Sequence, residues 1–242
     1  MRKWKSAVFA ACAIMTTMSS PAFAGSWIEN FDSFDTKRWN DRDGSNGPFF
    51  GCKFRTSKTN INNGKMEIGI GDNGPSNDKN QCGEVSTKGT FGYGKFLITM
   101  TPSYIKGSNS AFFLYTGDTG GAANHYEIDM EFIVENGKRK LHTNYFIKGS
   151  DNNSANVKRF DTGNGPFQVG FEWKADSIRW FYVNGAGKEV NYRTANVKIS
   201  QKMNLFVNHW YANNSDTNST GFLGSYDGTE GKAIFDKIEV YF

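Results

Sequence analysis

Residues 127–131 read Glu127-Ile128-Asp129-Met130-Glu131, an alternation of acidic and apolar side chains that predicts a β-strand. Successive side chains of a strand point to opposite faces, so the three carboxylates share one face and the apolar residues share the other. Three anions on one face repel one another and need a partner or a chemical task to hold them there. The alternative is an exposed acidic strand face, but no cation interrupts the three carboxylates.

Short β-rich runs, bounded by Gly, Pro, Asn or Ser, continue outward from this strand. The turn 135–137 is expected to join it to residues 141–147 as a hairpin. Helical periodicity is nearly absent. We therefore expect an all-β, two-sheet antiparallel sandwich with the acidic strand on a concave face, and segments 27–31 and 235–242 in one sheet. The other expected strands are 65–70, 94–100, 111–116, 171–173, 178–183, 203–210 and 233–242. The last of these contains the segment 235–242.

The first 24 residues have the pattern of a secretory signal peptide. Arg2, Lys3 and Lys5 precede an apolar stretch, 7–15, that is too short to span a bilayer. Ala22-Phe23-Ala24 is a small-x-small cleavage site. Cleavage there would leave 218 of the 242 residues as one domain, 25–242. We expect a protein secreted to the periplasm or the medium, with no membrane anchor.

Loss of the signal peptide changes the charge and the cysteine count. Three cations lie in it, so the net charge of +4 falls to +1 and indicates no nucleic-acid partner. Cys12 is also lost. The remaining pair, Cys52 and Cys82, favours one disulfide in an exported protein, with two buried thiols as the alternative.

The acidic strand fits the chemistry of glycosidic bond cleavage. That reaction needs a carboxylate nucleophile and a protonated carboxylic acid on opposite sides of one bond. Glu127 and Glu131 would supply the pair, and Asp129 between them would help to set their protonation states. A flat strand separates their backbones by about 13 Å, whereas a retaining enzyme needs carboxyl groups about 5–5.5 Å apart. A curved strand with side chains that lean together would shorten the gap.

Two alternatives to hydrolysis remain at this point. A sugar-binding jelly-roll module without catalysis shares the architecture, although binding alone needs neither a nucleophile nor an acid. A transglycosylase would use the same chemistry and pass the glycosyl group to a second sugar.

A colinear series of motifs resembles glycoside hydrolase family 16, and most of all its bacterial licheninases (endo-β-1,3-1,4-glucanases). Besides the acidic strand, the series comprises Ser45-Asn46-Gly47, Cys82-Gly83-Glu84, Phe91-Gly92-Tyr93-Gly94, residues 112–117, Asn144-Tyr145, residues 180–185, Asn208-His209-Trp210 and residues 223–226. The resemblance implies a β-jelly-roll with a substrate cleft across its concave sheet and a double-displacement mechanism. By position, Glu127 would be the nucleophile, Glu131 the general acid/base and Asp129 their helper.

The resemblance also implies where the polysaccharide is held. Amides and carboxylates bond sugar hydroxyls, while aromatic rings cover apolar sugar faces. For Phe113, plain core packing is an equal alternative. The implied substrate contacts are Asn46, Phe50, Glu84, Phe113, Asn144, Asn208 and Trp210.

The family further implies a bridge between Cys52 and Cys82, and a structural Ca²⁺ on the convex side. The calcium ligands would be backbone carbonyls and one aspartate at Asn30, Gly64 and Asp236, and oxygen ligands of this kind suit Ca²⁺. No cofactor is implied for catalysis, and we expect a monomer. The chain's histidines lack the spacing of metal ligands.

Three positions depart from the licheninase pattern. Ser86 replaces an Arg, His125 a Trp and Phe146 a Tyr. His125 lies two residues before Glu127 and so faces the cleft, where it would contact the sugar or tune Glu127; the alternative is a polar strand residue without a task. The departures indicate a rebuilt glycone side, so a succinoglycan-type exopolysaccharide is the alternative substrate to mixed-linkage glucan.

Overall fold

The computed structural model describes residues 25–71, 80–117, 122–135, 138–150, 156–160, 163 and 165–242. The expected signal peptide, 1–24, lies outside these ranges, as do turn residues 136 and 137 of the expected hairpin. Within the described ranges, no helix is long and apolar enough to cross a membrane.

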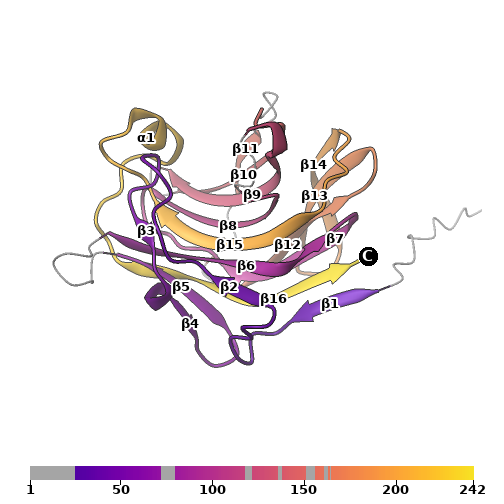
Figure 1. The fold of residues 1–242 in the computed structure, drawn as a ribbon, viewed down its shortest axis with the longest axis horizontal. Helices are drawn as coiled ribbons and strands as arrows, with labels where there is room; N and C mark the ends of the chain where they lie inside the picture. Colours follow the sequence, from indigo (N-terminus) through magenta and orange to yellow (C-terminus); the bar gives the residue numbers. More distant parts are fainter. Residues whose placement is uncertain are drawn as a thin grey trace, which may run out of the picture.

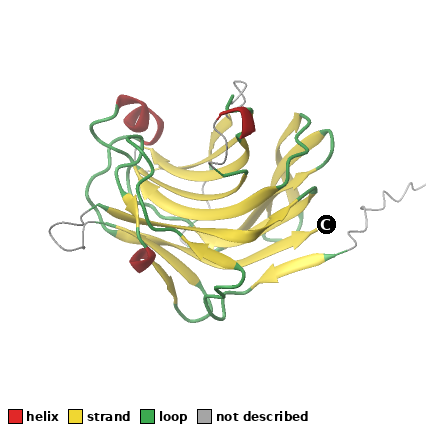
Figure 2. Cartoon of the chain, viewed as in Figure 1, coloured by secondary structure: helices red, strands yellow, loops and turns green. Residues whose placement is uncertain are grey.

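Two eight-stranded sheets stack face to face (Figures 1 and 2). In spatial order, the first sheet consists of β14 (Glu189–Asn196), β13 (Ser177–Val183), β12 (Phe167–Trp173), β7 (Gly94–Thr101), β16 (Gly231–Tyr241), β5 (Met66–Ile70) and β4 (Thr59–Ile61), with β1 (Ser26–Glu29) also paired to β16. The second consists of β11 (Asn156–Arg159), β10 (Lys138–Ile147), β9 (Tyr126–Glu135), β8 (Ser108–Tyr115), β15 (Met203–Tyr211), β6 (Gln81–Phe91) and β2 (Trp39–Asp41), with β3 (Lys53–Phe54) parallel to β6.

The expected sandwich is confirmed, together with two specific pairings. Strand β1 pairs with β16, with Ser26 opposite Tyr241, so the two ends of the domain share a sheet. Strands β9 and β10 form the expected hairpin, with Glu135 opposite Lys138. In Figure 1, β8, β9 and β15 are visibly curved, as a concave face requires.

Some elements were not expected from the sequence. They are β2, β3, β4, β6, β11, β14, the 3₁₀ turns η1 (Thr56–Lys58) and η2 (Ala122–Asn124), and the helix α1 (Thr217–Leu223). The first part of β6 is buried on both faces, so no polar–apolar alternation marks it. Helix α1 has only seven residues and includes Thr, Asn, Ser and Gly, which are weak helix formers.

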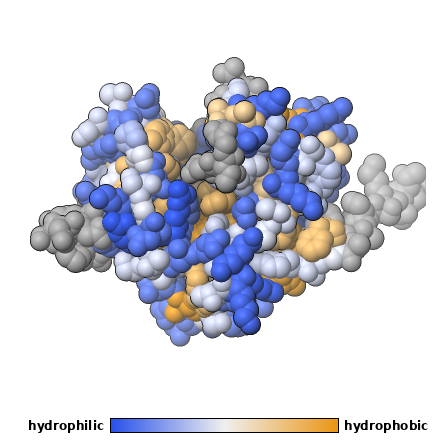
Figure 3. Space-filling model, in the orientation of Figure 1, coloured by the Kyte–Doolittle hydropathy of each residue, from blue (hydrophilic) through white to orange (hydrophobic). Residues whose placement is uncertain are grey.

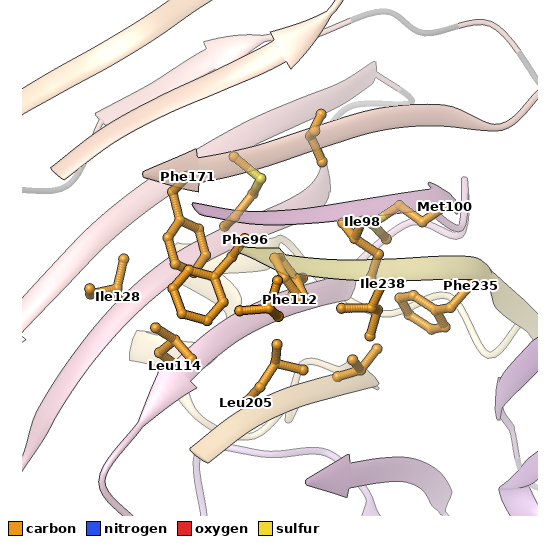
Figure 4. Close-up of a cluster of buried hydrophobic side chains, with 14 of the residues drawn as sticks. Phe96, Ile98, Met100, Phe112, Leu114, Ile128, Phe171, Leu205, Phe235 and Ile238 are labelled. Atoms are coloured by element: carbon orange, nitrogen blue, oxygen red, sulfur yellow. The ribbon is translucent and has the colours of Figure 1, made fainter. Parts of the chain in front are cut away.

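The core between the sheets fixes the direction of the acidic residues. Ile128 and Met130 of β9 are fully buried there. Figure 4 shows Ile128 near Leu114, with Phe96 and Phe171 alongside. Burial of each such side chain contributes roughly 1.5–3 kcal/mol. Because these residues point into the core, the alternate acidic residues of β9 point to the other face of the second sheet.

Candidate active site

Glu127, Asp129 and Glu131 all line a cleft of about 720 Å³ on the open face of the second sheet. Asp129 is buried, while the side chains of Glu127 and Glu131 are 18% and 16% exposed. The cleft runs from Phe222 on α1 to His125 beside η2, the two helices at the top of Figure 2. The structure therefore brings together the three carboxylates that the sequence placed on one face.

Asp129 is the middle carboxyl group of the triplet. Burial, and then the charges of Glu127 and Glu131, raise the pKa of Asp129 well above its usual range. Burial also raises the pKa of Glu127, while hydrogen bonds with His125 and Asp129 act in the opposite direction. The group that keeps its proton is therefore Asp129, and it donates a hydrogen bond that favours the ionised form of Glu127. The backbone below Asp129 is fixed by Trp180, whose Nε1 donates to its carbonyl at 2.8 Å.

His125 lies against Glu127, with Nε2 at 2.6 Å from Glu127 Oε2. Its ring stacks on Phe146, with centroids 4.9 Å apart and planes inclined by 15°. Tyr115 meets the same ring edge-on at 5.0 Å. Two of the three departures from the licheninase pattern, His125 and Phe146, thus touch each other at one end of the cleft. Ser86 lies on β6, opposite Phe206 of β15.

Glu131 is held by two residues that the sequence analysis missed. Asn109 Nδ2 donates to Glu131 Oε1 at 2.5 Å, and His142 Nδ1 lies 2.7 Å from Glu131 Oε2. His142 is directly opposite Glu131 in the β9–β10 register. The expected hairpin with its short turn contained the signal for this pairing, because a fixed turn length fixes the register.

Glu84 lies on the wall of the cleft between two donors. Arg42 Nη1 donates to Glu84 Oε1 at 2.8 Å, and Asn208 Nδ2 donates to Oε2 at 2.9 Å. Burial raises the pKa of Glu84, and both donors oppose the rise. Arg42 was not expected, because a contact across 42 residues of sequence leaves no local signal.

Asn46 and Asn208 present unpaired amide atoms to the cleft. Both side-chain atoms of Asn46 and the Oδ1 of Asn208 are buried, and no partner for them occurs among the described residues. A buried polar atom without a partner costs about 1–3 kcal/mol. A ligand with several hydroxyl groups would remove that cost. Asn144 also lines the cleft, and its Oδ1 accepts a hydrogen bond from Tyr145 N.

Aromatic rings cover the end of the cleft near α1. The rings of Phe50 and Trp210 lie 4.4 Å apart, and Phe49 and Phe222 pack against Trp210. Phe113 stacks on Phe206 at 5.1 Å and also lines the cleft, so its two expected functions, packing and lining, coincide.

The expected disulfide is confirmed. Cys52 and Cys82 are bonded, with Cα atoms 5.7 Å apart. The bridge ties the segment that carries Asn46 and Phe50 to β6, which carries Glu84. Three of the expected sugar contacts are therefore braced by one covalent bond.

The three expected calcium ligands lie in segments that meet on the first sheet, where β16 passes from its pairing with β5 to its pairing with β1. Asn30 directly follows β1, whose Glu29 is opposite Ile238, so it comes near Asp236. Gly64 lies in the β4–β5 turn, and the adjacent Lys65 forms an ion pair with Asp236 Oδ1. Asp236 Oδ2 is buried without a partner in the described structure. Groups of three His, Cys, Asp or Glu that could hold a metal are absent from the described residues, so a cation here would need backbone carbonyls as well as Asp236.

A β-sandwich whose concave face carries paired glutamates among amides and aromatic rings has the features of a polysaccharide hydrolase. The sequence model for glycosyl hydrolases family 16 matches residues 48–227. β-Glucanases of Bacillus licheniformis and Bacillus amyloliquefaciens are each 33% identical to the chain, over 91% and 90% of its length and 87% of theirs.

Solved structures agree with this match. A lichenase from a mouse hindgut metagenome superimposes with a TM-score of 0.77 at 29% identity, covering 89% of this chain and 98% of the lichenase. The B. licheniformis β-glucanase gives a TM-score of 0.77 at 30% identity, covering 90% and 98%. The chain belongs to glycoside hydrolase family 16 and is a glycoside hydrolase.

Proposed function

We propose that this hydrolase cleaves internal linkages of β-1,3-1,4-glucan with retention of configuration at the anomeric carbon. The observation that carries the proposal is the placement of Glu127, Asp129 and Glu131 on one face of β9, inside one cleft. The substrate assignment is supported by the relatives, which are β-glucanases and a lichenase.

The two glutamates would act in two steps. In the first, Glu131 gives its proton to the leaving oxygen while the carboxylate of Glu127 attacks the anomeric carbon and forms a glycosyl ester. In the second, Glu131 takes a proton from water as the water oxygen attacks the anomeric carbon, and the bond from that carbon to Glu127 breaks, so that Glu127 leaves as a carboxylate. Asp129 keeps its proton in both steps and donates a hydrogen bond to Glu127.

The cleft walls would hold the sugar chain. Asn46 and Asn208 have amide atoms without partners among the described residues, and Glu84 and Asn144 line the same cleft, so hydroxyl groups would find donors and acceptors on both sides. Phe50, Phe113 and Trp210 would cover apolar sugar faces. His125 would border the glycone side through its contact with Phe146.

The nucleophile assignment is tested with azide. Glu127→Ala should abolish turnover, and added azide should restore it with a product of inverted configuration, because azide then attacks from the vacated side. Glu131→Ala is the matched control: azide should intercept the glycosyl ester there and give a product of retained configuration. Normal turnover by Glu127→Ala would rule out the nucleophile assignment.

The substrate is tested by reducing-end release from barley β-glucan, laminarin, agarose, carrageenan, xyloglucan and a succinoglycan-type exopolysaccharide, with Glu127→Gln as a control. Barley glucan should be cleaved fastest. Activity on the exopolysaccharide alone would favour the second candidate, a depolymerase whose glycone side is shaped by the contact between His125 and Phe146. Transfer products in place of reducing ends would indicate a transglycosylase.

We also propose that the protein is exported and acts as a monomer. The pattern of residues 1–24 supports export. A secreted protein whose measured mass equals that of a chain beginning at Gly25 would verify it. In Figure 3, hydrophilic residues predominate on the visible face and hydrophobic ones lie in smaller groups. Few large apolar side chains of the described structure are exposed, namely Ile28, Tyr93, Tyr104 and Phe242, and this small number supports the monomer. Sedimentation would test it.

A further inference from the structure

Glu131 is gripped at both oxygens by side chains from the two strands that flank it. Asn109 on β8 donates to Oε1 at 2.5 Å, and His142 on β10 lies 2.7 Å from Oε2. A carboxyl group bonded at both oxygens cannot rotate about its terminal torsion without losing a hydrogen bond. The orientation of Glu131 is therefore set from outside its own strand.

Both partners are themselves fixed. The side chain of His142 is only 8% exposed, and its ring meets Phe222 of α1 edge-on at 5.0 Å. Asn109 is fully buried, and its Oδ1 has no partner within the described structure. The side-chain amide of Asn109 therefore makes its hydrogen bond here to Glu131. The two buried partners, Asn109 and His142, thus hold a side chain that is partly exposed to the cleft. Their positions therefore determine the orientation of Glu131.

Glu127 is held differently. Its Oε2 meets His125, which is 26% exposed and borders the cleft, and its second carboxyl partner is Asp129 on the same strand. His125 is therefore placed to meet the substrate as well as Glu127. His142, which is clamped between Glu131 and Phe222, is placed mainly to hold Glu131.

We infer that His142 is a positioning residue for the general acid/base, and this inference rests on the proposed function. With Asn109, it aims the carboxyl group of Glu131 at the leaving oxygen. When Glu131 gives its proton to that oxygen, it becomes a carboxylate, and N–H donors at both of its oxygens stabilise the new charge. His142 donates its Nδ1–H throughout and passes no proton on, so the proton taken from water in the second step returns to Glu131.

Two variants separate the hydrogen bond of His142 from its packing. His142→Phe keeps a ring against Phe222 but removes the donor, whereas His142→Gln keeps an amide donor that can reach Glu131. The substrates are barley β-glucan, whose sugar leaving group needs a proton, and the 2,4-dinitrophenyl β-glycoside of a trisaccharide from that polymer. Dinitrophenolate is stable as an anion, so its release needs no general acid.

His142→Phe should lower kcat on barley glucan about 10- to 100-fold, part of the roughly 10²–10⁴-fold that general acid catalysis supplies, with KM nearly unchanged. The burst of dinitrophenolate should keep its wild-type rate. His142→Gln should restore most of the lost kcat. Glu131→Ala serves as the reference, because it should show the same contrast between the two substrates in a stronger form.

Equal losses on both substrates would overturn the inference, because they would show a general defect in the cleft. Wild-type kcat in a folded His142→Phe would also overturn it. If that variant does not fold, Asn109→Ser removes the other donor and should give the same leaving-group contrast. A Glu127→Ala variant that remains active would refute the proposed function itself, so the two failures are distinguishable.

Discussion

At the residue scale, the three carboxylates of β9 lie on one face but in different surroundings. A retaining mechanism needs one ionised and one protonated carboxyl group at the start of the reaction. Burial and two adjacent charges keep the proton on Asp129, which donates to Glu127. Glu131 is bonded instead to the neighbouring strands. Because Asp129 is protonated, the electrostatic repulsion within the triplet is lower, and Glu127 can be ionised.

His209 predicts a loss of stability in acid. It is fully buried, its Nδ1 donates to Ile68 O at 3.0 Å, and burial lowers its pKa to about 4. Above about pH 6.5 the residue is neutral in both states and has no effect on the pH dependence. As the pH falls from there to about 4, only the unfolded chain takes up the proton. Unfolding then becomes easier by about 3 kcal/mol.

His209→Leu should remove this component. Urea unfolding of the wild type and the variant at pH 7 and pH 4.5 measures it as a difference, so the buried carboxyl groups, common to both proteins, cancel. The variant should gain relative to the wild type as the pH falls. His209→Gln, which is neutral and polar, should behave like Leu in its pH dependence. A constant difference between wild type and variant across this pH range would contradict the prediction.

How much of the site could be predicted depended on how far each contact reaches along the chain. The shared face of Glu127, Asp129 and Glu131 follows from the two-residue period of a strand, so local sequence was enough. Arg42 meets Glu84 across 42 residues, and only the folded sheet brings them together. His142 was an intermediate case, since the hairpin register would have revealed it.

At the element scale, helix α1 closes one end of the cleft. Its residue Phe222 packs on Trp210 and His142, so the helix touches both a proposed sugar contact and the partner of Glu131. A seven-residue helix has little stability of its own. Its position therefore depends on its cap and on this aromatic packing.

Asp216 is that cap, because its Oδ1 accepts from the backbone N–H groups of Asn218 and Ser219, both at 2.9 Å. Asp216→Ala should lower the free energy of unfolding by about 1 kcal/mol. It should also raise KM for barley glucan several-fold while kcat changes less, because Phe222 borders the cleft. Thermal unfolding and steady-state kinetics measure both effects. Asp216→Asn keeps the capping oxygen, so equal damage from Asn and Ala would count against the cap.

The elements that escaped prediction lack a local pattern. Strand β6 is buried on both faces where it carries Cys82 and Glu84. Its sequence therefore lacks the alternation of polar and apolar residues, and its polar residues favour the interpretation as a loop. Strands β2 and β3 have only three and two residues, and pairing with β6 alone defines them. Strand β9 was predictable because one face is core and the other is cleft.

At the scale of the whole molecule, the two sheets have different functions. The first sheet packs its inner face on Ile128 and Met130, and Trp180 fixes the backbone of β9 from below. The second sheet carries the cleft. The sandwich class was predictable because the sequence showed many strands and almost no helical periodicity. The strand order was not, because non-consecutive neighbours such as β8 and β15 are joined only in the folded state.

We propose that calcium stabilises the fold at the place where β1, β16 and the β4–β5 turn meet. Asp236 offers one buried oxygen that has no partner among the described residues, while Lys65 forms an ion pair with the other. A ligand that binds only the folded state stabilises it by about 2.7 kcal/mol at a concentration 100 times its Kd. Chelation should therefore lower Tm, while activity at low temperature persists because the glutamates lie on the other sheet.

Two substitutions at this site should have opposite effects on calcium binding. Asp236→Ala removes the carboxylate, so Tm should no longer respond to calcium or to chelator. Lys65→Gln removes the ammonium group that competes for the same carboxylate, so the variant should bind calcium more tightly than the wild type, although it should be less stable in chelator. Measurement of Tm at increasing calcium concentrations tests the wild type and both variants. The site is refuted if chelation leaves the wild-type Tm unchanged, or if Asp236→Ala responds to calcium as the wild type does.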